Sequence, residues 1–271
     1  MQVCIGIRYL CTNAFQVVVG DTAGCSQKTV YNIVLRVVDA LAHPDIVQKF
    51  IIFKPEDEQW CRARSHEFAR TGKMPNVIGA VDGTLIRIKS PPVDAFQYMS
   101  RKGTSCLNVC LIADAVGRIL YINSGSPGWV HDATIWRNSS PAAVFNSGVA
   151  VPGYRILGNS GYANGSGIIT PFRPSAVQGD ARKTRYNRGH CRMRSIVEMT
   201  TGCLKSRFPI LSSELRVGPR KASKIVIACA VLHNIMCLRA CTMRQLGSRK
   251  ATMAQPEADV EDVRAYIVER I

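Results

Sequence analysis

The sequence predicts an α/β protein, in which a sheet is flanked by helices and preceded by a small helical region. Residues 85–89 alternate polar and apolar side chains, as a half-buried strand does. Two further apolar segments, at 107–114 and 118–123, are separated by a Gly-containing turn, which is typical of a hairpin. The segments 187–207 and 219–240 repeat apolar residues at helical spacing.

Size and charge limit the possible functions. The chain has 271 residues, of which 46% are hydrophobic, enough for one large domain or two modest ones. It carries 35 Lys and Arg against 19 Asp and Glu, a formal net charge of +16. This imbalance favours a polyanionic partner, nucleic acid before membrane, although basic proteins of other kinds share it.

The cysteines and the apolar segments indicate the cellular compartment. There are eleven cysteines and no Cys-x-x-Cys pair, so we expect reduced core cysteines in an intracellular protein. A zinc site is an alternative that no ligand spacing supports. The apolar stretch from Val3 is interrupted by Arg8 and has no cleavage pattern, so it does not resemble a signal peptide. No apolar run approaches ~20 residues, so we expect no membrane span.

Residues 3–41 are predicted to form three short helices. Gly24 is placed to end the second helix and Ser26 to cap the third. The third helix would leave Lys28 and Arg36 outside, in the pattern of a helix-turn-helix whose last helix enters the DNA major groove. A small helical bundle without DNA contact has the same pattern. Met1 almost directly precedes the first helix, which fits an N-terminally shortened chain.

Apolar residues of these helices are expected to share buried faces. The predicted face of the second helix consists of Phe15, Val18, Val19 and Thr22, and that of the third consists of Val30, Val34, Leu35, Val37, Val38 and Leu41. A connecting helix should follow within residues 46–75. Pro55 would lie in its first turn, with three acids near the positive end of its dipole, and it would end near Gly72.

Asp82 follows a buried apolar stretch at 77–81. A charged carboxylate in such a setting is costly unless something compensates it, and a bound cation would do so. The alternative is that Asp82 and Gly83 form a turn between two strand segments.

A second carboxylate, Asp132, ends the loop 125–132. As an N-cap of a short helix at 133–139 it would be fully explained, and His131 would then be a loop residue. A fourth strand at 155–158 leads into Asn159.

The predicted helix at 187–207 carries Glu198 on a polar stripe. An ion pair with Arg194, one turn earlier, is the simplest role for this acid. A dense basic run precedes and enters the helix, formed by Lys183, Arg185, Arg188, Arg192 and Arg194. The last long helix, at 219–240, is apolar nearly all round, so His233 is expected to be a hydrogen-bonded core residue. The polar tail at 241–271 is predicted to hold a short helix at 258–271 or to be a linker.

With these segments identified, the chain resembles the PIF/Harbinger transposase superfamily, and most closely the domesticated Harbinger transposase-derived nucleases. The resemblance covers roughly residues 1–240 and rests on an ordered set of segments: Gly79-Ala-Val-Asp-Gly-Thr84 with Pro91, Tyr98-Met-Ser-Arg-Lys-Gly103, Asn108-Val-Cys110, His131-Asp132 through Arg137-Asn-Ser139, Leu157-Gly-Asn-Ser-Gly-Tyr162, Thr170-Pro171, Arg185-Tyr-Asn-Arg-Gly-His190, Val197-Glu198 through Leu204-Lys-Ser-Arg-Phe208, and Ala230-Val-Leu-His-Asn-Ile235.

This resemblance implies a ribonuclease-H-like mixed sheet with a DDE-type acidic triad. The triad positions fall on Asp82, Asn159 and Glu198, and the family carries a further acid at the position of Asp132. The chemistry needs hard oxygen ligands for two divalent cations, Mg²⁺ or Mn²⁺, that bridge the scissile phosphate. The implied domains are a helix-turn-helix-like region at 1–45, a connecting helix at 46–75, the nuclease domain at 76–240 and a polar tail at 241–271.

The chain departs from this pattern at Asn159, where the second acid should be Asp. An amide lacks the negative charge that helps to hold a dication. Asp132 or Asp114 would supply that charge if its side chain pointed into the site. Two functions follow: a divalent-metal-dependent DNA nuclease with metal ligands Asp82, Asp132, Asn159 and Glu198, or a cleavage-impaired DNA-binding or adaptor protein.

DNA contacts are expected from Lys28, Arg36 and the basic run. A sequence-reading regulator is a third class, resting only on the first helices. The resemblance also implies a separate Myb-like DNA-binding partner and a location in the nucleus, or in nucleus and cytoplasm.

Overall fold

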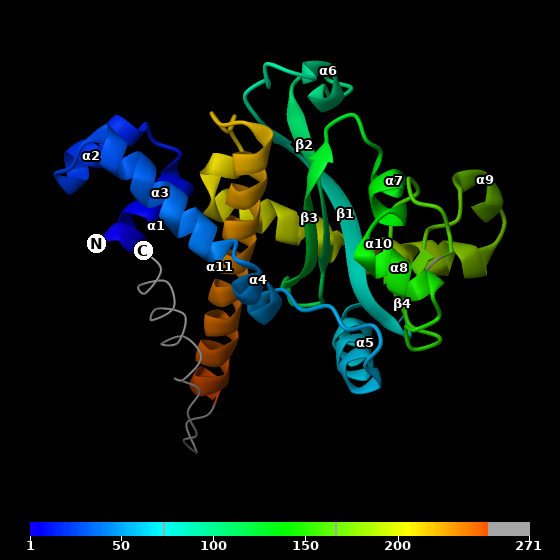
Figure 1. The fold of residues 1–271 in the computed structure, drawn as a ribbon. Helices are drawn as coiled ribbons and strands as arrows, with labels where there is room; N and C mark the ends of the chain where they lie inside the picture. The colour runs from blue at the N-terminus through cyan, green and yellow to red at the C-terminus, as the bar shows by residue number, and fades with distance from the viewer. Residues whose placement is uncertain (73, 166, 249–271) are drawn as a thin grey trace.

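The computed structural model describes residues 1–72, 74–165 and 167–248, and it centres on one five-stranded mixed sheet (Figure 1). The strand order is β3-β2-β1-β4-β5. The strands span Val77–Arg87 (β1), Cys106–Ala113 (β2), Ile119–Pro127 (β3), Arg155–Leu157 (β4) and Ile168–Ile169 (β5). The α/β class and the mixed sheet are therefore confirmed, and the two-residue β5 is a strand that the sequence did not predict.

The central strand β1 is continuous through Asp82 and Gly83, so the interpretation of these two residues as a turn is wrong. Along one edge β1 pairs antiparallel with β2 over Ala80–Arg87. Along the other edge it pairs parallel with β4, but only between Val77 and Ala80. Asp82 therefore lies two residues beyond the end of the β1–β4 pairing. At this point β1 has β2 along one edge and, in the described part of the chain, no strand along the other.

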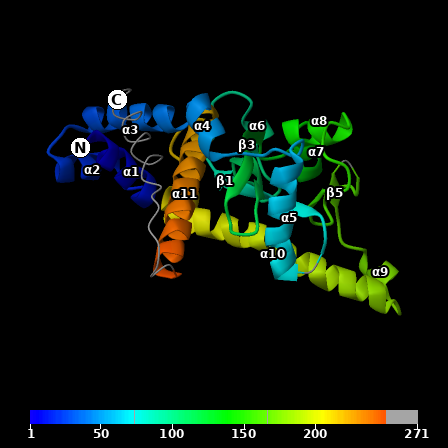
Figure 2. The same cartoon turned by 90° about the horizontal axis from the view of Figure 1, so that it is seen from below.

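Helices cover both faces of the sheet, and alternate residues of β1 face them. Ala80 and Ile86 pack in one core with α10 (Ala181–Arg207) and α11 (Pro219–Ser248). Val81 packs in a second core with α7 (Asp132–Arg137) and α8 (Ser140–Asn146). Because successive strand side chains point to opposite faces, Asp82 belongs to the α10 face and Gly83 to the α7 face. Figure 2 shows α10 running beneath the sheet from α11 to α9 (Pro174–Val177).

Three helices form the N-terminal region, as predicted: α1 (Gln2–Thr12), α2 (Gln16–Ala23) and α3 (Gln27–Leu41). Gly24 ends α2 with a left-handed φ of 65°, and the Ser26 side chain accepts a hydrogen bond from the Thr29 N–H at the start of α3. The buried face of α3 packs against α1, α2 and α11. The predicted face of α2 is wrong: Phe15 and Val18 are exposed and only Val19 is fully buried, because α3 covers one side of this short helix.

The connection to the sheet contains two helices where one was predicted. Pro44 starts α4 (Pro44–Phe50), and α5 (Glu58–Gly72) follows after an extended segment. Pro55 lies outside α5, so its predicted place in the first helical turn is wrong. Asp57 precedes the helix and accepts a hydrogen bond from the Trp60 N–H, which explains why the helix starts at Glu58.

Both C-terminal helices are longer than predicted. The helix α10 begins at Ala181, where Asp180 accepts hydrogen bonds from the N–H groups of Arg182 and Lys183, so the whole basic run is helical. The helix α11 continues to Ser248, into the segment predicted as tail. The helix predicted at 258–271 lies outside the described residues.

Within α11, the segment Pro219–Arg239 is the one described stretch long and apolar enough to cross a membrane by length and composition. Its buried side chains pack against the sheet and α3, as those of a core helix do. The expectation of no membrane span stays a prediction. His233 is buried, and its Nε2 lies 2.9 Å from the Gly117 carbonyl oxygen, so the predicted core role is confirmed.

Four short helical segments were not predicted: α6 (Ala95–Tyr98), α8, α9 and the 3-10 turn η1 (Pro209–Leu211). The ten cysteines that the structure describes are free, as expected. Their predicted core placement is correct for Cys61, Cys106, Cys110 and Cys229, which are buried. It is wrong for Cys4, Cys191 and Cys203, which lie on exposed helix faces.

Candidate functional site

Asp82 is a half-buried carboxylate with few partners. Its side chain is 20% exposed. Burial raises the pKa of Asp82 above its ordinary value, and the nearby charges of Asp132 and Glu198 raise it further, while Arg194 and the Gly83 N–H oppose the shift. The charged form of this acid is thus under-compensated by the protein, which is the condition under which an added cation is most strongly attracted.

Asn159 is the first partner of Asp82. Its Nδ2 donates to the Asp82 Oδ1 at 3.1 Å, while its own Oδ1 accepts the Gly161 N–H at 2.7 Å. The opposite amide orientation would place its oxygen against a carboxylate and its NH₂ group against an N–H group, so the network fixes the orientation seen. Asn159 therefore offers Asp82 a donor and keeps its oxygen in the turn after β4.

Arg194 on α10 links Asp82 to Glu198. Its Nη1 lies 3.8 Å from the Asp82 Oδ2, and its Nη2 pairs with the Glu198 Oε1 at 2.5 Å. The predicted Arg194–Glu198 helix pair is confirmed. Arg194 is also one of the predicted DNA contacts, but in this arrangement its guanidinium faces the two acids. The side chains of Asp82, Asn159, Arg194 and Glu198 thus converge on the α10 face, where β4 ends.

Asp132 lies on the other face of β1. Its carboxylate occupies the space beside Gly83 where a Cβ would be, and its Oδ1 accepts a hydrogen bond from the Asn108 Nδ2 at 2.7 Å. The predicted N-cap role is wrong, because His131 holds the cap position of α7 and Asp132 is the first helical residue. Within 1–72, 74–165 and 167–248, no three His, Cys, Asp or Glu side chains gather as metal ligands would, so Asp132 does not complete a group with Asp82 and Glu198.

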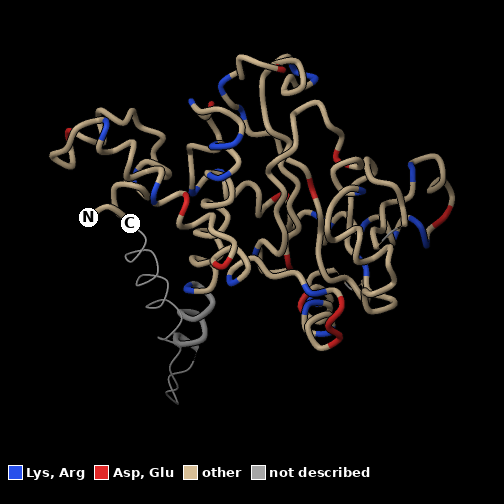
Figure 3. The backbone as a smooth tube through the Cα atoms, viewed as in Figure 1, with Lys and Arg blue, Asp and Glu red and all other residues tan. Residues whose placement is uncertain are grey.

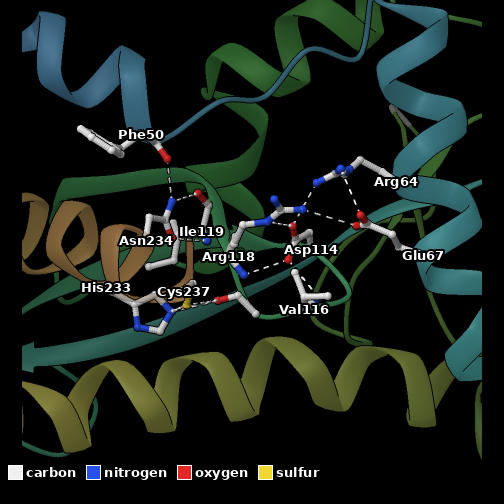
Figure 4. A network of polar contacts seen from close by, with 11 residues as sticks. Phe50, Arg64, Glu67, Asp114, Val116, Arg118, Ile119, His233, Asn234 and Cys237 are labelled. Carbon is white, nitrogen blue, oxygen red and sulfur yellow. Dashed lines mark hydrogen bonds and ion pairs between the residues drawn. The ribbon is translucent and has the colours of Figure 1, made fainter. Parts of the chain in front are cut away.

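Asp114, the other acid considered as a substitute, belongs to a separate polar network (Figure 4). It is fully buried, and its oxygens accept the Val116 and Arg118 N–H groups, the Arg118 Nε at 2.6 Å and the Arg64 Nη1 at 3.3 Å. Glu67 pairs with both arginines. Asp114 therefore holds the β2–β3 turn against α5 and does not face Asp82.

The donor types at Asp82 and Glu198 fit a hard divalent cation, whereas Asn159 does not. Mg²⁺ is commonly bound by one or two carboxylates, waters and substrate phosphate oxygens, so two acids are sufficient for one such ion. A third ligand at position 159 would need the amide oxygen, which the Gly161 N–H already occupies. A cation at the two acids would also take over the place of Arg194 beside Asp82.

The predicted DNA-contact residues fall in two places. Along the first half of α10, Arg185, Arg188 and Arg192 are exposed and Lys183 is half-buried. Figure 3 shows Lys and Arg around the start of this helix, beyond the edge of the sheet. Lys28 and Arg36 are exposed on α3, where the Lys28 Nζ lies 5.5 Å from the centre of the Tyr31 ring. Their DNA contact stays a prediction.

Some residues of this region carried no functional signal in the sequence analysis. Asn108 lies in one of the family-like segments, and the structure shows that it is buried and donates to both Asp132 and the Val130 carbonyl. Tyr162 and Cys110 lie buried close to Asp82 and Asp132; burial raises the pKa of the Cys110 thiol to about 12. No spacing rule predicts from the sequence that an amide or a thiol within a strand, such as those of Asn108 and Cys110, will lie next to the acids of the site.

Comparison with known proteins gives consistent results. The family described as "DDE superfamily endonuclease" matches residues 81–234. The chain is 32% identical over 237 residues to the proteins named "Putative nuclease HARBI1" of Rattus norvegicus and Homo sapiens, covering 86% of this chain and 66% of each relative. It is 24% identical over 252 residues to "Protein ALP1-like" of Arabidopsis thaliana, covering 87% of this chain and 60% of that relative.

The chain thus spans about two thirds of the length of these relatives. No solved structure matches it. The matched residues 81–234 contain the three predicted triad positions and the further acid, Asp132. They also contain most of the mixed sheet and the helix α10 described above. The chain therefore belongs to the DDE superfamily endonucleases, with the Harbinger transposase-derived nucleases as its relatives.

Proposed function

We propose that this protein is a DNA nuclease that hydrolyses phosphodiester bonds with the help of a divalent cation, and that its activity is weak. The observation that carries the proposal is the convergence of Asp82 and Glu198, from β1 and α10, on the single positive charge of Arg194. Both carboxylates contact the same guanidinium, so a divalent cation between them would take over its role of neutralising the two charges.

Mg²⁺ or Mn²⁺ would be held by Asp82 and Glu198 and would supply Lewis-acid activation of water and stabilisation of the leaving oxygen. In the presence of that ion, Arg194 would turn from the acids to a phosphate oxygen of the substrate, where its guanidinium binds well. The exposed arginines of α10 would hold the DNA backbone next to the acids.

Weak activity is expected because the second ligand position is Asn159. Its amide donates a hydrogen bond to Asp82 and adds no negative charge, so the site lacks one of the charges that a two-cation arrangement needs. Asp132 does not replace that charge directly, since it lies against the opposite face of β1.

The test is cleavage of supercoiled and linear DNA by the purified chain with Mg²⁺ or Mn²⁺. Glu198→Gln should abolish cleavage, and Asn159→Asp should increase it. Glu214→Gln, at an exposed acid that lies outside both β1 and α10, is the matched control and should cleave like the unaltered protein. Cleavage that persists in Glu198→Gln would contradict the proposal.

The second candidate is a DNA-binding or adaptor protein that no longer cleaves DNA. The fixed orientation of Asn159, with its NH₂ group on Asp82, favours this candidate. It predicts salt-sensitive DNA binding without cleavage by the unaltered chain at any Mg²⁺ concentration, and a gain of cleavage in Asn159→Asp. For either candidate we propose DNA as the target, a separate Myb-like DNA-binding protein as partner and a nuclear location, on the basis of the family.

A further inference from the structure

A cavity of about 270 Å³ opens on the α7 face of β1, beside Gly83. It lies between two loops, residues 99–105 and 128–132, and none of the residues placed in the acidic site on the α10 face line it. Its walls combine one exposed aromatic ring, that of Trp129, with the cationic side chains of Arg101 and Lys102. His131 and Asp132 complete the lining on the side of α7.

The first loop is held in shape by hydrogen bonds of its own. Met99 and Ser105 form a bridge at its base, and the hydroxyls of Ser100 and Thr104 lie 3.1 Å apart. The Gly103 N–H donates to the Ser100 carbonyl at 2.9 Å, with Gly103 at a left-handed φ of 69°. This tight turn presents Arg101 and Lys102 toward the cavity.

The second loop is attached to the sheet. The Asn108 Nδ2 donates to the Val130 carbonyl at 2.9 Å and to Asp132, which fixes the backbone after Trp129. On the other side of Trp129, a Cβ at Gly128 would collide with the Cys106 Sγ and the Tyr98 carbonyl oxygen. The backbone thus approaches its neighbours closely on both sides of Trp129, while the Trp129 side chain is 60% exposed.

Trp129 is 60% exposed and lines the same cavity as the cationic side chains of Arg101 and Lys102. The Arg101 Nη2 lies 2.7 Å from the His131 Nδ1, so these two side chains meet across the cavity mouth. An aromatic platform beside cationic side chains is the combination that binds unpaired nucleotides, with the base on the ring and the phosphate on the cations. The small volume limits the occupant to about one nucleotide.

We propose that this cavity receives a single unpaired nucleotide of the bound DNA strand, its base stacked on Trp129 and its phosphate held by Arg101 and Lys102. The inference rests on the proposed DNA-processing function and names the substrate form: DNA with an unpaired base next to the cleavage position. Gly83 lines the cavity and Asp82 precedes it on β1, so the strand would pass over the β1 edge that β4 leaves uncovered.

Binding in EDTA tests this inference without requiring cleavage. Fluorescence anisotropy would compare three labelled oligonucleotides of one sequence: a full duplex, a duplex with one unpaired nucleotide, and the same duplex with an abasic residue at that position. The intact chain should prefer the unpaired base over both others. Trp129→Ala should weaken binding of that DNA roughly five- to 150-fold and leave the full duplex unchanged, and Trp129→Phe should keep most of the preference.

Phe96→Ala is the matched control, because Phe96 is 71% exposed on the neighbouring α6 and does not line the cavity. Equal affinity of the unaltered chain for all three DNAs would overturn the inference, as would the same loss on all three in Trp129→Ala. Loss of cleavage with this preference intact would instead contradict only the proposed nuclease activity.

Discussion

Asp82 and Asp114 are two acids of the same sheet that meet arginines in opposite ways. Asp114 is fully buried and accepts four hydrogen bonds from the Val116 and Arg118 N–H groups and the Arg64 and Arg118 side chains. Asp82 is 20% exposed, accepts one side-chain hydrogen bond from Asn159, and lies 3.8 Å from Arg194.

The difference separates a structural acid from the acid that we propose as a metal ligand. A buried carboxylate whose lone pairs are all used by fixed donors stabilises the fold and has no capacity for a new ligand. A carboxylate with one side-chain donor, one backbone N–H donor, a guanidinium 3.8 Å away and a raised pKa is electrostatically unsatisfied and can gain from a cation. An Asp–Arg contact alone does not distinguish the two.

The largest expected effect is on the structural acid. Asp114→Asn should lower the free energy of unfolding by about 3–5 kcal/mol, because it leaves the Arg64 and Arg118 side chains without their buried partner. Urea denaturation followed by circular dichroism measures this. A loss under about 1 kcal/mol would show that Glu67 alone neutralises both arginines.

Replacing Asn159 by the Asp that the resemblance implies should make the stability of the protein depend on Mg²⁺. Without metal, Asn159→Asp should lose roughly 1–3 kcal/mol, because a donor to Asp82 becomes a second negative charge. Saturating Mg²⁺ should recover this loss by binding the folded state. The readout is the melting temperature with and without Mg²⁺, and Asn146→Asp, at an exposed position at the end of α8, should show no Mg²⁺ effect.

Removing the charge of Asp82 should stabilise the metal-free protein slightly. Because the folded-state pKa of Asp82 is raised, ionisation of this group costs stability as the pH rises from the ordinary Asp range through the raised pKa. Asp82→Asn should abolish that fall and slightly raise the free energy of unfolding at neutral pH. Denaturation at several pH values measures it; a destabilised variant would mean that the Arg194 contact outweighs the cost of burial.

The smallest expected effect concerns one surface charge of α10. Arg188→Gln should reduce the salt dependence of DNA binding by about one unit of the logarithmic slope, whatever the DNA sequence. Arg62→Gln, on the exposed side of α5 with Glu58 as partner, should leave the slope unchanged. Equal slopes for both variants would place the DNA away from α10.

Much of the fold follows from local sequence rules, and the site does not. The capping by Ser26, the Gly24 helix end and the β2–β3 hairpin depend on neighbours in sequence, and they were predicted correctly. The length of α10 was missed because its first two turns carry few apolar residues and their helical start depends on Asp180.

Within the candidate site, the resemblance predicts the triad positions, but the sequence could not assign Asp132 to a face of the sheet. Its position against Gly83 depends on the strand alternation of β1 and on Asn108, 24 residues earlier in the chain. The orientation of the Asn159 amide likewise depends on Asp82, which is 77 residues away. Long-range contacts of this kind leave no periodic signal in one sequence.

The helix α10 carries both the basic run and Glu198 on one continuous rod of 27 residues. At 1.5 Å per residue, the ten-residue interval from Arg188 to Glu198 corresponds to about 15 Å. One DNA strand advances 3.4 Å per nucleotide, so this interval equals about four nucleotide steps. In the proposed nuclease, Arg188 holds the DNA backbone and Glu198 holds the metal ion. The length of α10 between these two residues therefore sets the distance along the strand from the held phosphate to the cleaved one.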